Sequence, residues 1–283
     1  MKNLLSMCSI LAFIIFCSCE NETNRDKEGL IIYQENQISW VRNFEPLNPV
    51  SVCRWPTRGG IYETLFLYNP IKIDWTPWLA TDYSWQDNNK RLILTIRSDV
   101  QWSDGQPFSA HDVSYTFNLT KEFPALDTRN YWDYLKSVVA ISDTEIEVNF
   151  KRIYVPGFDA IAGAHIVPKH IWNKLEDPLI FDNPNPVGTG PFTEILRFNS
   201  QIWELGKNPN YWQTGKPHVE KLIFPTFSSN EQTTLALLSG NLDYAGAFIP
   251  AIDRIYVDKD PEHHHYWFRN TGHSTFLLTN TKD

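Results

Sequence analysis

Acid–base catalysis by paired carboxylates is the one enzymatic chemistry that the residue types of this sequence suggest. Glu63, Asp104 and Asp243 are available for it, and the chain carries 11 tryptophans. Glycoside hydrolases combine tryptophan platforms with two carboxylates placed across a cleft. A covalent nucleophile is not indicated, because no Ser–His–Asp or Cys–His pattern appears and Cys53 has no evident base nearby. A carbohydrate-active hydrolase is therefore one function to be weighed.

Two other motifs resemble ligand sites only superficially. His263, His264 and His265 are consecutive, and neighbouring residues of an extended segment point to opposite faces, so they cannot all face one ion. No Cys pair completes a zinc pattern. The Gly-Thr-Gly-Pro segment at 188–191 lacks the lysine and the spacing of a nucleotide loop, and it is interpreted as a bend. We expect surface histidines, no metal and no cofactor.

The composition excludes a further class of partner. The 283 residues include 25 Lys+Arg and 33 Asp+Glu, which gives a formal net charge of −8. This acidic balance is spread along the chain and leaves no basic footprint, so nucleic acid is not an expected partner. Aromatic residues make up 14% of the chain, which suggests stacking surfaces in addition to a core.

The N-terminus is typical of an exported lipoprotein. An apolar run over 4–16 has signal-peptide length and falls short of the roughly 20 residues that a membrane-spanning helix needs. A small residue directly before Cys19 resembles the lipobox of bacterial lipoproteins, which implies a lipid on Cys19. Cys17 as the acceptor, an ordinary signal peptide and an uncleaved anchor are the alternatives. We expect a signal peptide over 1–18, a polar tether over 19–28, and a body held outside the cytoplasm.

The elements expected to position functional side chains mix strands and helices without strict alternation, which favours a mixed α/β (α+β) body. Ser109 and Asp112 have the spacing of a capping box and predict a helix that runs to about residue 121. Ser229 and Gln232 repeat this spacing before a helix that ends near Ser239. Strands are expected at 30–33, 91–97, 145–150, 193–198, 201–207 and 222–227.

Six segments carry motifs that occur in a recognisable order. They are YETL at 62–65, WLATDYSW at 78–85, LTIRSDVQWSDGQPFSAHD at 94–112, VGTGPF at 187–192, NPNYW at 208–212 and LSGNLD at 238–243. Together they resemble the family 5 extracellular solute-binding proteins, which are receptors of bacterial ABC importers for oligopeptides, nickel and some oligosaccharides. The three carboxylates named above lie in or beside segments that this resemblance already explains.

The resemblance implies a receptor whose two lobes close over a ligand. It places a discontinuous first lobe at 29–57 and 186–269, with an inserted subdomain at 58–185. The hinge and the start of the second lobe fall at 270–283. Members of the family are roughly twice as long, so the resemblance also implies a truncated receptor whose second lobe is largely missing.

Ligand-binding residues follow from the same resemblance, because the chain approaches the cleft after the first strand and after the second capped helix. The candidates are Trp40, Arg42, Asn43, Trp55, Tyr244 and Phe248. The open alternatives are that Trp40 belongs to the core, that Arg42 is a solvated charge, and that Tyr244 and Phe248 pack under the hinge.

The resulting hypothesis is a lipid-anchored, extracytoplasmic receptor, not an enzyme, that delivers an oligopeptide or oligosaccharide to an ABC permease. Tryptophan faces suit the apolar faces of sugar rings, whereas a peptide needs partners for its charged termini or its backbone. The composition therefore favours a sugar, and a peptide stays open. A hydrolase and a non-functional truncated receptor are the alternatives.

Overall fold

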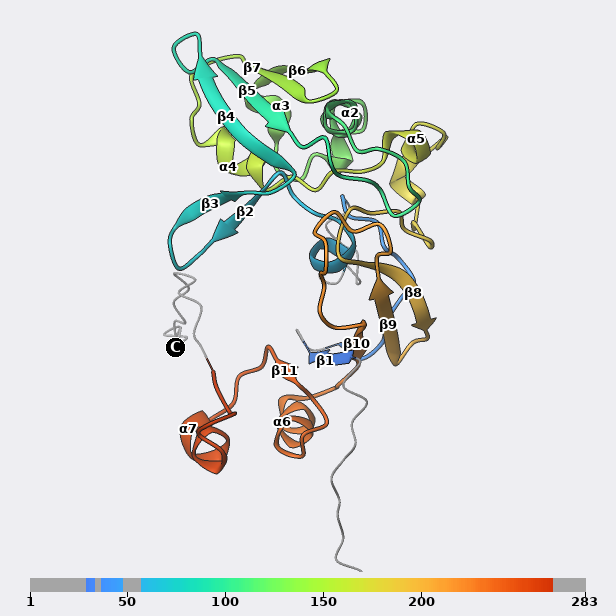
Figure 1. Ribbon diagram of the computed structural model, residues 1–283, viewed down its shortest axis with the longest axis vertical. Coiled ribbons are helices and arrows are strands. Elements are labelled where there is room, and N and C mark those ends of the chain that lie inside the picture. Colours follow the sequence, from blue (N-terminus) through green and yellow to red (C-terminus); the bar gives the residue numbers. More distant parts are fainter. Residues whose placement is uncertain (1–28, 34–36, 48–56, 267–283) are drawn as a thin grey trace, which may run out of the picture.

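The computed structural model describes residues 29–33, 37–47 and 57–266, and Figure 1 shows their arrangement. The predicted signal peptide and tether, Cys19, Cys53, Trp55 and the hinge segment at 270–283 lie outside these residues. Within the described ranges, none of the helices is long and apolar enough to traverse a bilayer.

The elements are β1 (Gly29–Tyr33), η1 (Thr57–Ile61), β2 (Phe66–Asn69), β3 (Asp74–Pro77), β4 (Ala80–Gln86), β5 (Arg91–Ile96), α2 (Ala110–Glu122), η2 (Pro124–Leu126), α3 (Tyr131–Tyr134), β6 (Leu135–Ser142), β7 (Glu145–Phe150), α4 (Gly157–Ala162), α5 (Lys169–Trp172), η3 (Pro178–Ile180), β8 (Phe192–Phe198), β9 (Ile202–Lys207), β10 (Lys221–Pro225), α6 (Asn230–Leu238), β11 (Tyr244–Ala245), α7 (Ile252–Ile255) and η4 (Val257–Lys259).

A five-stranded sheet with the order β11-β1-β10-β9-β8 forms one part of the protein. β1 runs parallel to both β10 and β11, whereas β9 is antiparallel to its neighbours β8 and β10. The β8–β9 hairpin turns at Asn199, whose Oδ1 accepts hydrogen bonds from the backbone N–H groups of Gln201 and Ile202. The mixed α/β fold predicted from the sequence is confirmed.

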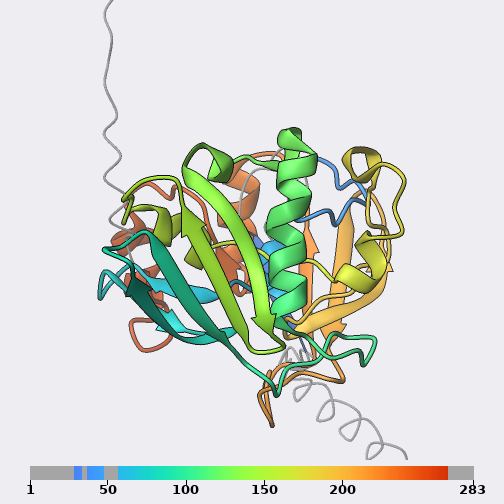
Figure 2. The ribbon, with the colours of Figure 1, turned by 90° about the horizontal axis from the view of Figure 1, so that it is seen from above.

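A four-stranded antiparallel sheet with the order β4-β5-β7-β6 forms the other part. Its strands alternate: Leu92, Leu94 and Ile96 of β5 are buried, while the residues between them are more exposed. Helix α2 packs along β6 and β7 (Figure 2). Its capping box is complete, because the Ser109 hydroxyl accepts from the helix backbone and the Asp112 carboxylate accepts from Ser109 N–H.

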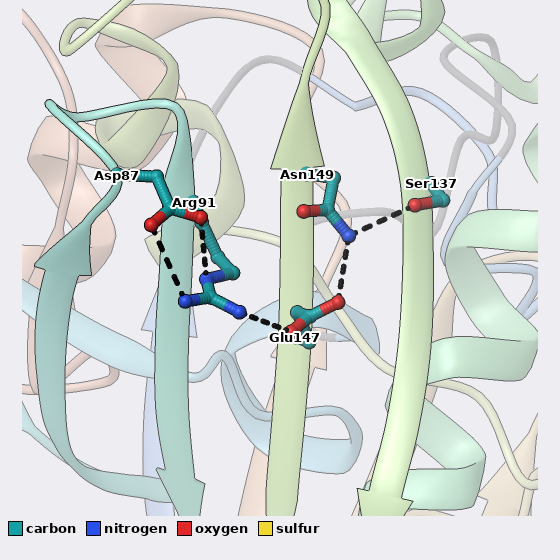
Figure 3. A network of polar contacts seen from close by, with 5 residues as sticks. All are labelled: Asp87, Arg91, Ser137, Glu147 and Asn149. Atoms are coloured by element: carbon teal, nitrogen blue, oxygen red, sulfur yellow. Dashed lines mark hydrogen bonds and ion pairs between the residues drawn. The ribbon is translucent and has the colours of Figure 1, made fainter.

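The face of this sheet away from the core carries a polar network beside exposed apolar side chains such as Val139. Arg91 Nη1 lies 3.3 Å from Glu147 Oε2, and the Asn149 amide donates to Ser137 Oγ at 3.1 Å. Figure 3 shows these contacts crossing β5, β7 and β6 side by side. Exposed ion pairs contribute roughly 0–1 kcal/mol each, so this network makes the face compatible with water more than it stabilises the sheet.

The two parts share one continuous core. The five-stranded sheet takes β1 from before residues 58–185 and β8–β11 from after them, while the four-stranded sheet lies within that range. Buried side chains of both sheets, including Leu94, Val148, Trp203 and Phe224, belong to a single hydrophobic cluster. The predicted boundaries of the lobe and its insertion agree with this division of strands and stay a prediction.

Candidate functional site

Three parallel strands end at the same edge of the five-stranded sheet. β1 ends at Tyr33, β10 at Pro225 and β11 at Ala245. Helix α6 connects β10 to β11, and its first turn is capped by the Ser229 hydroxyl, which accepts from Gln232 N–H at 3.3 Å. Ligands of open α/β sheets bind beyond the carboxyl ends of parallel strands. This edge is therefore the candidate for a binding site.

Tyr244 and Phe248 lie at this edge. Tyr244 pairs with Ile32 in the β1–β11 ladder and is half-buried. Phe248 follows β11 with 75% of its surface exposed, whereas the next residue, Ile249, is buried with Tyr33, Leu237 and Leu242. The buried Ile249 fixes the segment that carries the exposed ring. An exposed aromatic ring on a fixed segment can stack against a flat apolar face of a ligand.

Trp40, Arg42 and Asn43 occupy a different place. The Trp40 ring is 8% exposed and packs edge-on against Trp203 of β9, with 5.7 Å between ring centroids. Arg42 donates to the carbonyl of Pro184 and to Asn185 Oδ1, both at 3.1 Å. The Asn43 amide donates to Asp182 Oδ1 at 2.7 Å. These three residues tie the segment after β1 to the 182–185 loop and to β9.

The structure therefore separates the predicted ligand-binding residues into two groups. β11 is at one end of the strand order, and β9 lies three strand positions away from it, roughly 14 Å at about 4.8 Å per strand. Tyr244 and Phe248 lie at the β11 end, whereas Trp40 contacts β9 and the Arg42 guanidinium lies 5.8 Å from the Phe198 ring of β8. A ligand role for Trp40, Arg42 and Asn43 stays a prediction, and no contact with the first group supports it among the described residues.

The three carboxylates considered for hydrolysis each have hydrogen-bond partners of their own. Asp104 Oδ2 lies 2.7 Å from His170 Nε2, and Asp243 Oδ2 accepts a hydrogen bond from Ile31 N–H at 2.8 Å. Glu63 is buried among the indole and hydroxyl groups of other residues, and burial raises its pKa. A glycosidase needs its two carboxyl groups across one open cleft. The described contacts do not give any two of these residues that arrangement.

The histidine run makes local contacts. His263 Nδ1 lies 3.0 Å from Asp260 Oδ1, and the His264 ring stacks on Tyr256 with 4.0 Å between centroids. Hydrogen bonding to His263 is the main cause that lowers the pKa of Asp260. In the part of the chain that the structure describes, no group of three or more His, Cys, Asp or Glu side chains is arranged to hold a metal ion.

Phe227 is a residue at the β11 edge that the sequence interpretation did not select. Its ring packs edge-on against Tyr33 at 5.5 Å, and its backbone bridges to Gln37, just beyond the end of β1. The signal was available in principle, since the strand at 222–227 and the capped helix after it were both predicted. What was missing is the parallel pairing of β10 and β11 with β1, which brings Phe227 beside the site.

A mixed α/β lobe with an inserted sheet and an exposed aromatic ring beyond parallel strand ends has the architecture of a solute-binding receptor. Residues 74–283 match the family described as bacterial extracellular solute-binding proteins, family 5 Middle. The chain belongs to this family, which confirms the resemblance carried by the sequence motifs. Its members are transport receptors, not enzymes.

Similar proteins, both curated sequences and solved structures, agree with this family membership. The nickel-binding periplasmic protein of Escherichia coli K12 is 27% identical over 224 residues, which cover 74% of this chain and 40% of that protein. A mannohexaose-bound periplasmic oligopeptide-binding protein of an ABC transporter from Thermotoga maritima is 29% identical, with a TM-score of 0.76 over 87% of this chain and 46% of that one. AppA of Bacillus subtilis, solved with a nonapeptide, shares the fold at 21% identity, with a TM-score of 0.68 over 84% of this chain and 46% of that one. The chain spans less than half the length of these relatives.

Proposed function

We propose that this chain forms the first lobe of a substrate-binding receptor of an ABC importer, and that the receptor captures an oligosaccharide or an oligopeptide. The observation that carries the proposal is the exposed Phe248 ring on a fixed segment beyond the carboxyl ends of β1, β10 and β11. The ligand is held between lobes that close about a hinge, and the closed form delivers it to the permease. The ligand itself is not chemically changed.

An oligosaccharide is the favoured ligand. The Thermotoga maritima relative, 29% identical, was solved with mannohexaose, and the chain carries 11 tryptophans, 12 tyrosines and 17 phenylalanines. Sugar rings offer apolar faces that stack on aromatic side chains. An oligopeptide is the second candidate, because an extended peptide can add to a sheet edge such as that of β11.

Replacement of Phe248 by alanine is expected to weaken ligand binding about two- to twelvefold, since an aromatic stacking contact contributes roughly 0.5–1.5 kcal/mol. The free energy of unfolding should not change measurably, because the ring is 75% exposed. Titration calorimetry with mannohexaose on the receptor purified from its own cells measures the effect. Ile180→Ala is the control, because Ile180 is 79% exposed in η3, which is not part of the five-stranded sheet, and it should leave affinity unchanged. Equal affinity of Phe248→Ala and wild type would remove Phe248 from the site.

The membrane anchor is a second part of the proposal. The lipobox-like residues before Cys19 support lipid attachment there, and an extracytoplasmic location follows. Cys19→Ala is expected to move the protein from the membrane pellet to the soluble fraction, because the protein would lose the lipid that attaches it to the membrane. Cell fractionation and immunoblotting measure this. Cys17→Ala is the matched control, and a Cys19→Ala protein that stays in the pellet would contradict the anchor.

A further inference from the structure

A buried carboxylate lies at the junction between residues 58–185 and the chain that follows them. Glu63 is 7% exposed. Its Oε1 accepts hydrogen bonds from Trp78 Nε1 at 2.7 Å and from the Tyr211 hydroxyl at 3.1 Å. Its Oε2 accepts from Trp212 Nε1 at 3.1 Å, and the Thr189 hydroxyl also bonds to the carboxylate. We call these five residues the Glu63 junction.

The Glu63 junction connects segments that are far apart in sequence. Glu63 and Trp78 precede the four-stranded sheet, whereas Thr189, Tyr211 and Trp212 follow it. The Trp78 and Trp212 rings also pack edge-on, with 5.2 Å between centroids. Contacts to one carboxyl group therefore join the segments on both sides of the four-stranded sheet, in addition to the hydrophobic core that the two sheets share.

The surroundings of this carboxyl group are neutral. All four hydrogen-bond partners are uncharged, and no cation contributes to its titration. Arg97 is a charged side chain that packs on the junction, with its guanidinium carbon 4.3 Å from the centroid of the Trp212 ring, and it pairs with Asp99. His165 meets the next residue, Thr64, through a backbone bridge. A buried carboxyl group without a cation is harder to ionise than one in water, whereas hydrogen bonds donated to a carboxylate favour ionisation. At Glu63 burial is the largest influence and raises the pKa, while the four hydrogen bonds act in the opposite direction.

The neutral acid satisfies every partner of the junction. Oε1, as the carbonyl oxygen, still accepts from Trp78 and Tyr211, and a hydroxyl at Oε2 still accepts from Trp212. The Tyr211 hydroxyl does not compete as an anion, since burial raises its pKa further above the ordinary value of 10.0. Protonation thus removes the cost of a buried charge without breaking the hydrogen bonds.

We propose that Glu63 is a proton-binding group at this junction, and that its protonation stabilises the folded lobe when the surroundings become acidic. This inference does not depend on the identity of the ligand. In an extracytoplasmic receptor, as proposed above, Glu63 would couple the pH of the surroundings to the stability of the lobe.

The direction of the pH dependence of stability follows from the linkage between proton binding and folding. The ordinary pKa of Glu63 is 4.5 and the folded-state pKa is higher, so between the two values the folded protein binds more protons than the unfolded chain. The stabilisation is fully present below pH 4.5 and is lost as the pH rises through the folded-state pKa. Each pKa unit of difference corresponds to a tenfold change in the unfolding equilibrium.

The test is urea unfolding of wild type and Glu63→Gln between pH 4.5 and pH 8, together with ¹³C NMR titration of the Glu63 carboxyl carbon in wild type. We expect wild type to lose stability with rising pH relative to Glu63→Gln. We also expect the carboxyl carbon and the Trp78 and Trp212 indole N–H signals to titrate together at a pH above 4.5. Trp212→Phe, which keeps a ring but removes one donor, should move that midpoint upward.

Two results would overturn the proposal. One is a Glu63 pKa at or below 4.5, which the NMR titration of wild type decides even if Glu63→Gln does not fold. The other is parallel pH profiles for wild type and Glu63→Gln. Glu145→Gln is the control substitution, because Glu145 is exposed in β7, and its profile should match wild type.

Discussion

Gly188→Ala is expected to destabilise the protein by about 3 kcal/mol, because there is no space for the added methyl group. A Cβ built on Gly188 lies 2.0 Å from the Ile61 carbonyl oxygen, and one on Gly190 lies 2.3 Å from that of Gly60. Both obstacles are backbone atoms, so no side-chain rotation relieves them. Urea unfolding at neutral pH measures the loss of stability. If the loss is large enough, the variant will not accumulate as folded protein.

The close approach at Gly188 and Gly190 exists because the two segments are hydrogen-bonded there. Gly190 N–H donates to the Ile61 carbonyl at 2.8 Å, and Ser103 N–H donates to the Gly188 carbonyl at 2.9 Å. Gly163→Ala is the matched control, since the nearest atom to its new Cβ is the flexible end of Arg129 at 3.2 Å. It should cost less than about 1 kcal/mol. A Gly188→Ala protein as stable as the control would show that the segments do not meet as described.

Trp40→Ala is expected to cost about 3–5 kcal/mol of stability, as is usual for deletion of a buried aromatic side chain. The Trp40 ring packs against Trp203, which also stacks on Phe224 at 4.6 Å, so its removal leaves a cavity in the aromatic core of the five-stranded sheet. Ile38→Ala, two residues earlier and 78% exposed in wild type, is the control and should have little effect. Thermal and urea unfolding measure the stability of both variants relative to wild type.

The opposite outcome for Trp40 has a definite meaning. If Trp40→Ala keeps wild-type stability and loses ligand affinity, the ring is a stacking platform as the sequence suggested, and the burial against Trp203 does not persist when ligand binds. Measuring unfolding and mannohexaose affinity on the same preparation separates the two roles.

Local features of the fold were predictable because their determinants are close in sequence. The helix capped by Ser109 and Asp112 begins where the motif places it and ends at Glu122, one residue beyond the expected end. For α6, Ser229 caps the helix as predicted, but the Gln232 side chain accepts from Ser228 instead of completing the box with Ser229. The β2–β3 hairpin was not predicted, and Ile73 at its turn has a φ of 55°, which β-branched residues rarely adopt.

The candidate site depends on pairings between distant residues, which local patterns do not contain. Whether Trp40 is a platform or core is decided by Trp203, and whether Tyr244 borders a site is decided by its pairing with Ile32. Glu63 illustrates the same limit. The sequence offered it as a catalytic carboxylate, whereas its partners Tyr211 and Trp212 lie 148 and 149 residues further along the chain and bury it.

Calorimetric titration of the receptor purified from its own cells, with mannohexaose and a nonapeptide as separate ligands, tests the central claim most directly. We expect saturable binding of at least one of them, with the sugar favoured, and mass spectrometry should recover the bound ligand unchanged. Absence of saturable binding for both, or recovery of shortened mannohexaose, would contradict a receptor of this kind.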